Sequence, residues 1–427
     1  MRHFSLIVPA LLTMTGRVTM LSISRWTEKG GSYRTVQRFF ATDLPWTKLL
    51  VQFFQAHCMF CRTRVYFGGR CHDHHQKRQI DARNRAFFSG ILSQVVSGLE
   101  FFVFSLVDVA ERKAYPVCAK QTVRSEAEKA ALKLRRKKRS KKSKPKPKGR
   151  LKGSLNKDKN ELKLSPELLR INELLSDLLK LLRVFLSIKY VALDGHFGHH
   201  QAVLMARKHD LHLISKMRKD AALHEKYEGA YGGRGAKKKY GKRLKYDLLP
   251  IKYLKNSEEK GEIITNYYQG IVLHKEFGQA INVVIIVKIH VKTQKVGHAI
   301  LFSSDVELSW EKLLDYYSLR FQIEFNFRDA KQHFGLEDFM NTTKNGVENA
   351  ANLSFLMVNV SAKLLNNSER KCVGINDLKS WFRGVKYALE TIKLVQPKAE
   401  TILIEQVKAA ISRIGSIHQH NFSDSSA

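Results

Sequence analysis

The spacing of apolar residues changes several times along the chain. Residues 1–56 carry apolar positions at helical spacing and predict a helical N-terminal region. Residues 85–117 differ, because aromatic and β-branched runs broken by Gly90 and Gly98 are typical of two or three paired strands. Helical spacing returns in "SPELLRINELLSDLLKLLRVFL", where Ser165 is a good N-cap. The first half therefore predicts helices, then strands, then a helix.

In the second half, strands and helices alternate. "KYVALDGHFG" is a short apolar strand that ends at Asp194, "HQAVLMARKHD" is a helix, and "LHLISKMRK" is a strand. This order predicts an α/β fold whose sheet has parallel strands. Helical spacing resumes at Ser309, a second N-cap. We expect a helical N-terminal region at 1–56, a first α/β part at 57–245, a β-strand insertion at 246–305, a helix pair at 306–365 and a helical C-terminal region at 366–427.

The charge balance indicates the class of partner. The chain has 74 Lys and Arg against 39 Asp and Glu, a net charge of +35, and such an excess favours a polyanion, nucleic acid above all. Residues 124–160 concentrate this charge and are interpreted as a linker that also contacts phosphates. No apolar run reaches the roughly 18 residues of a membrane span, and we expect no membrane partner. Five unevenly spaced cysteines and Pro9, which interrupts the apolar start, favour a cytoplasmic protein over a secreted one.

Asp194 is the first candidate for chemistry. It ends an apolar strand, and open α/β sheets bind their ligands at the carboxyl ends of their strands. The following Gly195 would let a metal ion or a phosphate approach the backbone closely. An aspartate in this place is also a common turn or cap residue, so Asp194 alone is weak evidence.

A second constellation follows Ser309. On one continuous helix, Tyr317, Arg320, Glu324 and Lys331 would share an arc of about 60°. A solvated charged face is the plain alternative, but bulky apolar residues flank this arc. These are Leu319, Phe321, Ile323, Phe325 and Phe327. A carboxylate beside two cations and a hydroxyl suits a phosphate bound next to a metal ion.

These residues carry a family resemblance. "YYSLRFQIEFNFRDAK" resembles the Tyr-x2-Arg-x3-Glu-x6-Lys signature of bacterial insertion-sequence transposases, which use an Asp-Asp-Glu triad on a ribonuclease-H-like fold. The four signature positions are those of the second constellation. "YVALDGHFG" is similar to the segment with the second aspartate of that family, here Asp194. "RWTEKGGSYRTVQRFF" and "LEDFMN" are also family-like, so the resemblance covers nearly the whole chain.

The resemblance implies an architecture and a reaction. The fold would be a ribonuclease-H-like mixed sheet flanked by helices, with an all-β insertion and helical N- and C-terminal regions. Asp194 and Glu324 would hold Mg²⁺ or Mn²⁺ for two-metal cleavage and strand transfer. Tyr317, Arg320 and Lys331 would contact the DNA. The partners would be double-stranded DNA, as transposon ends and target, and a second copy of the chain in a synaptic complex, with residues 1–56 binding the DNA ends.

The segment that should supply the first aspartate departs from the family. Relatives of this kind carry an apolar strand, then Gly-Asp and a Lys-x-Gly-Lys-x-Thr-His-Gly-like run. Before "FFSG" the chain instead has "CRTRVYFGGRCHDHHQKRQIDARNRA", without an apolar strand. Asp73 and Asp81 are the nearest carboxylates, and neither follows an apolar strand. Without a third carboxylate, a two-metal site is incomplete.

Three interpretations of this segment compete. One is a solvated loop, and another is translation out of frame. The third is a zinc site, although adjacent Cys71 and His72 do not have the usual ligand spacing. Its ligands would be Cys58, Cys61, Cys71 and one of His72, His74 and His75.

Out-of-frame translation can be tested on paper. If Gly69–Arg85 is encoded with suitable synonymous codons and read one base later, the product is Asp-Asp-Val-Met-Thr-Ile-Thr-Lys-Ser-Gly-Lys-Ser-Thr-His-Gly-Ile. This run restores an aspartate and the family-like lysine and glycine pattern, although residues 57–68 give no convincing product in one shifted frame. We therefore favour a transposase that is catalytically defective as written. The alternative is a non-catalytic DNA-binding protein, either a transposase remnant or a zinc-organised one.

Overall fold

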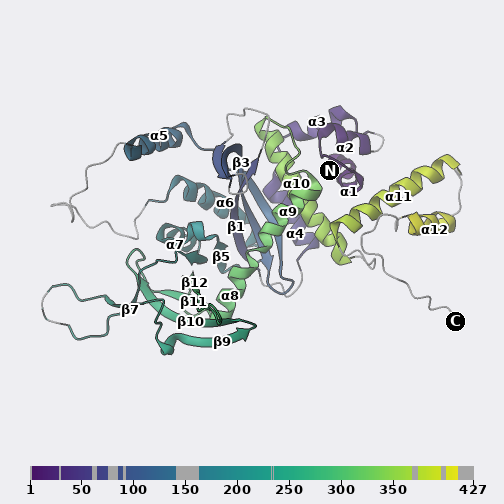
Figure 1. The fold of residues 1–427 in the computed structure, drawn as a ribbon. Helices are drawn as coiled ribbons and strands as arrows, with labels where there is room; N and C mark the ends of the chain where they lie inside the picture. The colour runs from purple at the N-terminus through teal and green to yellow at the C-terminus, as the bar shows by residue number, and fades with distance from the viewer. Residues whose placement is uncertain are drawn as a thin grey trace, which may run out of the picture.

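The central strands follow from the apolar runs seen in the sequence. The computed structural model describes residues 2–27, 30–59, 65–75, 85–89, 93–140, 163–231, 233, 235–367, 374–395 and 401–411. The strands β2 (Arg85–Ser89), β3 (Gln94–Asp108) and β4 (Lys113–Gln121) form the predicted antiparallel group. Beside them lie β1 (Val65–His75), β5 (Tyr190–Leu193) and β6 (His212–Met217). Figure 1 shows these strands at the centre of the molecule.

The order of the central strands is β3, β1, β5, β6. β1 is antiparallel to β3 and parallel to β5, and β5 is parallel to β6. An antiparallel meander continued by two parallel strands, with helices on both faces, agrees with the expected ribonuclease-H-like mixed sheet.

One expectation about this sheet is wrong. The segment before "FFSG" has no apolar strand pattern, yet residues 65–75 form β1 and pair with β3 along their whole length. The reason is that strand pairing is made by backbone N–H and C=O groups, which every residue here supplies. Gly68 and Gly69 also let the neighbouring side chains fill the space beside the strand. Residues 60–64 and 76–84, which include Cys61 and Asp81, lie outside the described residues.

The predicted β insertion continues the same sheet. β12 (Val296–Ser303) pairs with β6, and β11 (Ile281–His290), β10 (Ile263–His274) and β9 (Leu254–Lys260) follow as antiparallel neighbours. Two short strands, β7 (Leu223–Lys226) and β8 (Tyr240–Arg243), precede the predicted start at 246 and join the sheet through β10. The described strands thus form one twelve-stranded sheet.

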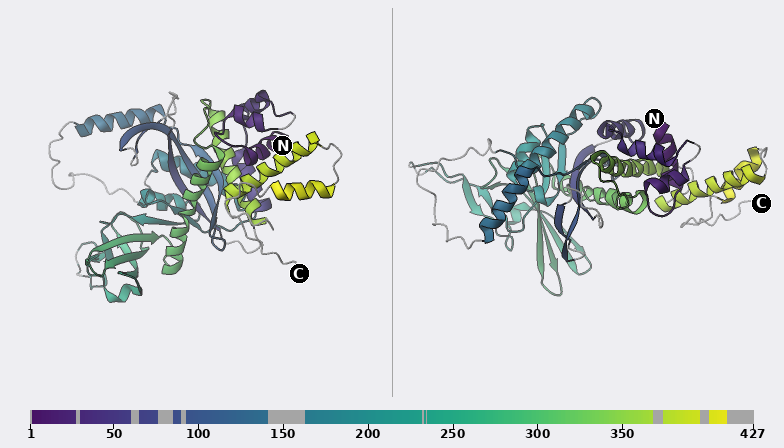
Figure 2. Two further views of the ribbon diagram at one scale, coloured as in Figure 1. Left: turned by 45° about the vertical axis from the view of Figure 1, so that its right-hand side comes forward. Right: turned by 90° about the horizontal axis from the view of Figure 1, so that it is seen from above.

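Helices cover both faces of the central sheet, as Figure 2 shows. One face packs against the N-terminal helices together with α9 and α10, and the other packs against α6 and α7. Successive residues of β3 alternate between the two cores: Phe101 and Val103 belong to the first, Phe102 and Phe104 to the second. The helices are α1 (Arg2–Thr13), α2 (Met20–Trp26), α3 (Tyr33–Ala41), α4 (Trp46–His57), α5 (Glu126–Ser140), α6 (Pro166–Leu182), α7 (His200–Arg207), α8 (Trp310–Leu319), α9 (Gln322–Phe334), α10 (Lys344–Asn367), α11 (Ile375–Val395) and α12 (Thr401–Ile411).

Two predicted helix starts are confirmed. The Ser165 hydroxyl accepts a hydrogen bond from the Leu168 N–H, and the Ser309 hydroxyl accepts one from the Lys312 N–H. In the predicted basic linker 124–160, residues 126–140 are helical, and residues 141–160 are not among those described. Among the described helices, none has the length and apolar character needed to cross a membrane.

Candidate functional site

Asp194 lies where the sequence predicts it, directly after a buried strand. Val191, Ala192 and Leu193 are fully buried, and Asp194 itself is half-buried. The Asp194 carboxylate accepts a hydrogen bond from the Gly195 N–H at 2.7 Å. Its backbone carbonyl accepts a second from the Ser215 hydroxyl, on β6, at 3.0 Å. The aspartate is therefore held at the carboxyl end of β5, where it also caps a short turn.

The neighbouring strand brings residue 70 to the same level. In the parallel pairing of β1 with β5, Gly68 is opposite Ala192 and Gly69 is opposite Leu193. The next residue in the chain is Arg70 within β1 and Asp194 directly after the end of β5. Where two parallel strands of an α/β sheet could each supply a carboxylate, this chain has one aspartate and one arginine.

Gly68 and Gly69 also show which face of the sheet packs against α9. A Cβ on Gly68 would clash with the side chain of Ile323 on α9, whereas one on Gly69 would lie 2.7 Å from Leu193 Cδ2 in the opposite core. Because residues alternate between faces along a strand, Gly68 is on the α9 side of β1 and Gly69 is on the opposite side. Ala192 shares a core with Ile323, so Asp194, two residues on, is on the α9 side too.

The predicted helix after Ser309 is two helices, which corrects the sequence-based geometry. α8 ends at Leu319 and α9 begins at Gln322, with Arg320 and Phe321 between them. At this break the backbone makes tighter bonds, from the Ile323 N–H to the Arg320 carbonyl and from the Glu324 N–H to the Phe321 carbonyl. The common arc calculated for one continuous helix therefore does not apply across it. Glu324 instead lies in the first turn of α9, where the helix dipole favours a carboxylate.

Three of the four signature residues still come together at this break. Arg320 Nη2 lies 3.6 Å from Glu324 Oε1, and the Arg320 guanidinium lies 5.4 Å from the centre of the Tyr317 ring. The Arg320 side chain is only 9% exposed, and its Nε and Nη1 atoms have no hydrogen-bond partner among the described residues. Lys331 is two turns further along α9, where its ammonium pairs with Glu337 Oε1 at 2.7 Å.

Two family comparisons agree with this arrangement. The chain matches the DDE superfamily endonuclease family over residues 1–262 and the transposase DDE domain over residues 170–360. It belongs to the DDE transposases. The first match includes β1 and Asp194, and the second includes Asp194 and Glu324. No curated protein matches the chain. The predicted membership of the DDE transposases is thus confirmed, and the family implies a DNA substrate, whereas the Tyr-x2-Arg-x3-Glu-x6-Lys signature and the roles of the individual residues remain predictions.

The family generally uses divalent metal ions, so the fit of this transposase to such ions can be examined. Within the described part of the chain, no group of three or more His, Cys, Asp or Glu side chains could hold a metal ion. Asp194 is the carboxylate on β5, and Glu324 already faces the cation of Arg320. With arginine at position 70, the described residues do not complete a three-carboxylate metal site.

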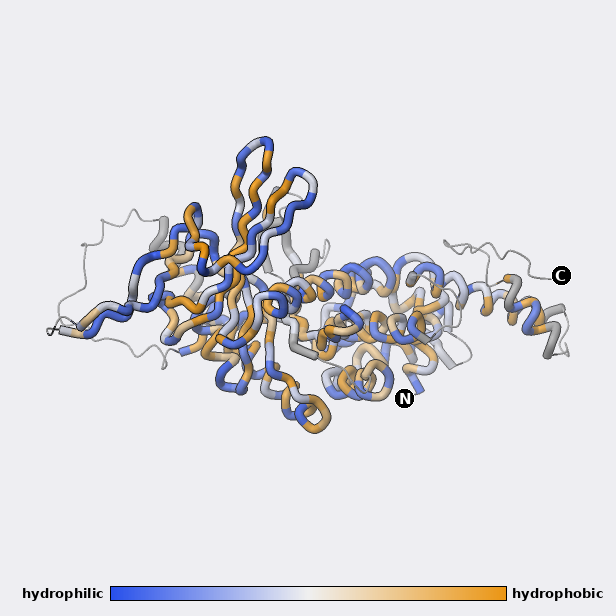
Figure 3. Tube along the Cα trace, turned by 90° about the horizontal axis from the view of Figure 1, so that it is seen from below, coloured by the Kyte–Doolittle hydropathy of each residue, from blue (hydrophilic) through white to orange (hydrophobic). Residues whose placement is uncertain are grey.

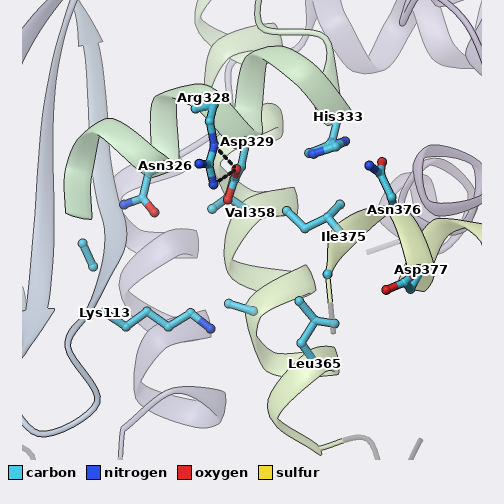
Figure 4. Close-up of a pocket in the computed structure, with 13 residues that line it drawn as sticks. Lys113, Asn326, Arg328, Asp329, His333, Val358, Leu365, Ile375, Asn376 and Asp377 are labelled. Carbon is cyan, nitrogen blue, oxygen red and sulfur yellow. Dashed lines mark hydrogen bonds and ion pairs between the residues drawn. The ribbon is translucent and has the colours of Figure 1, made fainter. Parts of the chain in front are cut away.

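A polar cavity that we did not predict from the sequence lies on the other side of α9. It has a volume of about 310 Å³ and lies between α9, α10, β4 and the start of α11 (Figure 4). Asn326, Asp329 and His333 line it from a face of α9 that points away from Glu324. Burial lowers the pKa of His333, and also that of Lys113, which lines the cavity from β4. In the sequence, the spacing of Asn326, Asp329 and His333, three and then four residues apart, already indicated that these three polar side chains share one face of a helix.

Proposed function

We propose that this DDE transposase binds double-stranded DNA at insertion-sequence ends but does not cleave it, because its first catalytic carboxylate is missing. The observation that carries the proposal is the strand register, which pairs Gly69 with Leu193 and so brings position 70, an arginine in this sequence, level with Asp194. A frame-shifted segment in β1 accounts for a strand whose backbone pairs normally while its sequence departs from the family.

In this proposal, Asp194 and Glu324 are the two remaining metal ligands, for Mg²⁺ or Mn²⁺. Two-metal cleavage requires carboxylates that hold both ions beside the attacking and leaving oxygens. An arginine at the third position would repel the ions electrostatically instead of binding them. Since each 1.4 kcal/mol lost from transition-state stabilisation lowers the rate about tenfold, losing the several kcal/mol that a metal supplies removes most of the activity.

The DNA contacts are assigned to Tyr317, Arg320 and Lys331. Arg320 supports this best, because two nitrogens of its buried guanidinium have no partner among the described residues, and such a group is costly unless it binds an anion. A backbone phosphate next to Glu324 would satisfy those nitrogens. A homodimer in a synaptic complex, DNA-end binding by residues 1–56 and a cytoplasmic location complete the proposal.

The zinc-organised alternative is disfavoured by the environment of Cys58. Its side chain is 2% exposed and packs in the core with Phe54 and Leu168. Burial raises the pKa of the Cys58 thiol to about 12, whereas zinc binds the thiolate. The other suggested ligands, Cys61, Cys71 and the three histidines, lie outside the described residues or have side chains that are not described.

DNA binding and DNA nicking should be measured separately. We expect the purified chain to bind a duplex carrying its insertion-sequence end and, with Mg²⁺ or Mn²⁺, to nick it no faster than Glu324→Gln does. Arg320→Ala should weaken binding, and Arg320→Lys should restore it in part. Nicking by the unmodified chain that Glu324→Gln abolishes would show that the site still works and would contradict the proposed defect.

A further inference from the structure

The end of the sheet farthest from β3 carries a basic projection. We define the hairpin arm as residues 223–246, which comprise β7, β8 and the loop between them. Figure 1 shows this loop extending away from the sheet, and Figure 3 shows it as hydrophilic along most of its length. The arm contains eight Lys or Arg and only two Glu. The charge is thus concentrated on a part of the molecule that neighbouring elements do not cover.

The root of the arm is firmly held. Leu223 and Leu244 are buried, and the Leu244 N–H donates to the Leu223 carbonyl at 2.9 Å. β7 pairs with β10 on its other side, and the rings of His224 and Tyr240 are in edge contact at 5.6 Å. The root therefore fixes the direction of the arm, while its distal loop extends into solvent.

The loop of the arm is rich in glycine. Gly233 and Gly235 both have φ of +77°, a conformation that residues with side chains adopt reluctantly, and a Cβ there would meet nothing within 4 Å. The loop is therefore thin and leaves its surroundings open. A narrow two-stranded ribbon of this kind has dimensions that fit a groove of duplex DNA.

The exposed lysines of the arm form no ion pairs with described residues. Lys226, Lys237, Lys238, Lys242 and Lys245 are exposed and make no ion pair with a described residue. The contacts recorded for the arm lysines are a Lys238 ammonium over the Tyr227 ring at 5.5 Å and a Lys239 bond to a backbone carbonyl. Hydrogen bonds from Lys252 and Tyr253 lower the pKa of Glu225, and Lys242 also helps to lower it, but within the described residues no carboxylate forms an ion pair with these five lysines.

Three surface lysines elsewhere in the chain differ in this respect. Lys180 pairs with Asp177 at 3.1 Å, Lys260 with Glu258 at 3.2 Å and Lys393 with Glu390 at 3.0 Å. These three lysines each have a carboxylate two or three residues away, whereas no arm lysine forms an ion pair with a described residue. Lysines that form no such ion pair, on a projecting ribbon, are suited to the regularly spaced phosphates of a duplex.

We propose that the hairpin arm grips the phosphate backbone of duplex DNA at a second place, separate from the contacts near Arg320. This inference rests on the proposed DNA-binding function. Five strand spacings of about 4.8 Å separate β7 from β5, so the arm lies on the order of 20 Å from Asp194. A duplex that passes both surfaces would be held at two points several base pairs apart, which orients it without reading its sequence.

The salt dependence of DNA affinity tests the arm. The test variant is Lys237→Ala/Lys238→Ala/Lys242→Ala in the full chain, with a mixed-sequence linear duplex as the probe. Each phosphate contact contributes about 0.9 to the slope of log affinity against log salt, so the slope should become shallower by roughly 2 to 3. Affinity near physiological salt should fall about tenfold.

The matched control removes the same charge elsewhere. Lys180→Ala/Lys260→Ala/Lys393→Ala should leave the slope near that of the unmodified chain, and arginine at the three arm positions should preserve it. Equal slopes for the arm variant and the unmodified chain would overturn the arm contact, as would an equal change in the control. Either result would favour an acidic protein, instead of DNA, as the partner of the hairpin arm. Failure of the unmodified chain to bind any duplex would instead contradict the proposed function itself.

Discussion

Strands β1 and β5 are parallel neighbours in one sheet, yet their sequences have little in common. β5 is short, apolar and fully buried at its last three residues, and an aspartate follows it. β1 is long and carries Arg70, Cys71 and three histidines in its second half. Both nevertheless occupy the centre of the sheet, in register.

The difference separates what makes a strand from what makes a catalytic position. Backbone hydrogen bonds to β3 and β5 place β1 whatever its side chains are, because all its residues offer the same N–H and C=O groups. A metal ligand, in contrast, depends on one side chain at one position. A change of sequence that leaves the backbone path intact can therefore remove the chemistry and keep the fold.

The largest effect is expected from restoring β1. Residues 69–84 would be replaced by Asp-Asp-Val-Met-Thr-Ile-Thr-Lys-Ser-Gly-Lys-Ser-Thr-His-Gly-Ile, the frame-shifted product. We expect Mg²⁺-dependent nicking of an end-bearing duplex to rise by a factor of about 1,000 or more, because a carboxylate returns beside Asp194. Adding Glu324→Gln to the restored chain should return the rate to background. A folded restored chain that binds DNA without nicking it would refute the frame-shift explanation.

The packing of α9 on β1 should respond to Gly68→Val. A side chain there would clash with Ile323, and overpacking of this kind costs about 1–3 kcal/mol of folding free energy. Urea unfolding followed by circular dichroism measures the change. Gly297→Val is the matched control, because Gly297 is also in a strand and a Cβ on it would meet nothing within 4 Å. Equal stability of the two variants would argue against close packing of α9 on β1.

A hydrogen bond of Tyr190, the first residue of β5, is expected to stabilise the folded chain. The Tyr190 hydroxyl donates to Asp305 Oδ2 at 2.7 Å, so Tyr190→Phe should cost about 1.5–3 kcal/mol, as loss of a hydrogen bond to a charged group does. Tyr267→Phe is a suitable comparison, because the Tyr267 hydroxyl has no hydrogen bond to a described residue. This substitution should change the free energy of unfolding by less than about 0.5 kcal/mol. Urea unfolding followed by circular dichroism measures both variants. Similar losses of folding free energy in the two would show that the Tyr190 hydrogen bond is not what stabilises β5.

The smallest effect is expected from metal removal and thiol labelling. Burial raises the pKa of Cys58 to about 12 and that of Cys118 to about 11, so neither thiol of the folded chain should react with iodoacetamide at neutral pH. Chelation should leave the melting temperature unchanged. Peptide mass spectrometry and a thermal melt measure the two results. One tightly bound zinc per chain, lost in Cys71→Ala, would instead support the zinc-organised alternative.

Much of the fold could be predicted from local patterns. The apolar run of β5, the strands around Gly98 and the caps at Ser165 and Ser309 depend on neighbours in the sequence, and the structure contains each of them. The charge excess and the family resemblance likewise needed only the residues themselves. The departure of residues 69–84 from the family could be seen in the sequence as well.

Three features depended on contacts between distant segments. β1 is a strand because β3 and β5 supply its hydrogen-bond partners, and no local pattern records that. The helix break at Arg320, which sets the geometry of Glu324, was hidden behind a continuous helical spacing. The position of Arg70 beside Asp194 joins residues more than a hundred positions apart, so only the pairing of two strands could reveal it. The sequence by itself determined which chemical groups the chain has, and the tertiary structure decided which of them meet, because register and packing are set by long-range contacts.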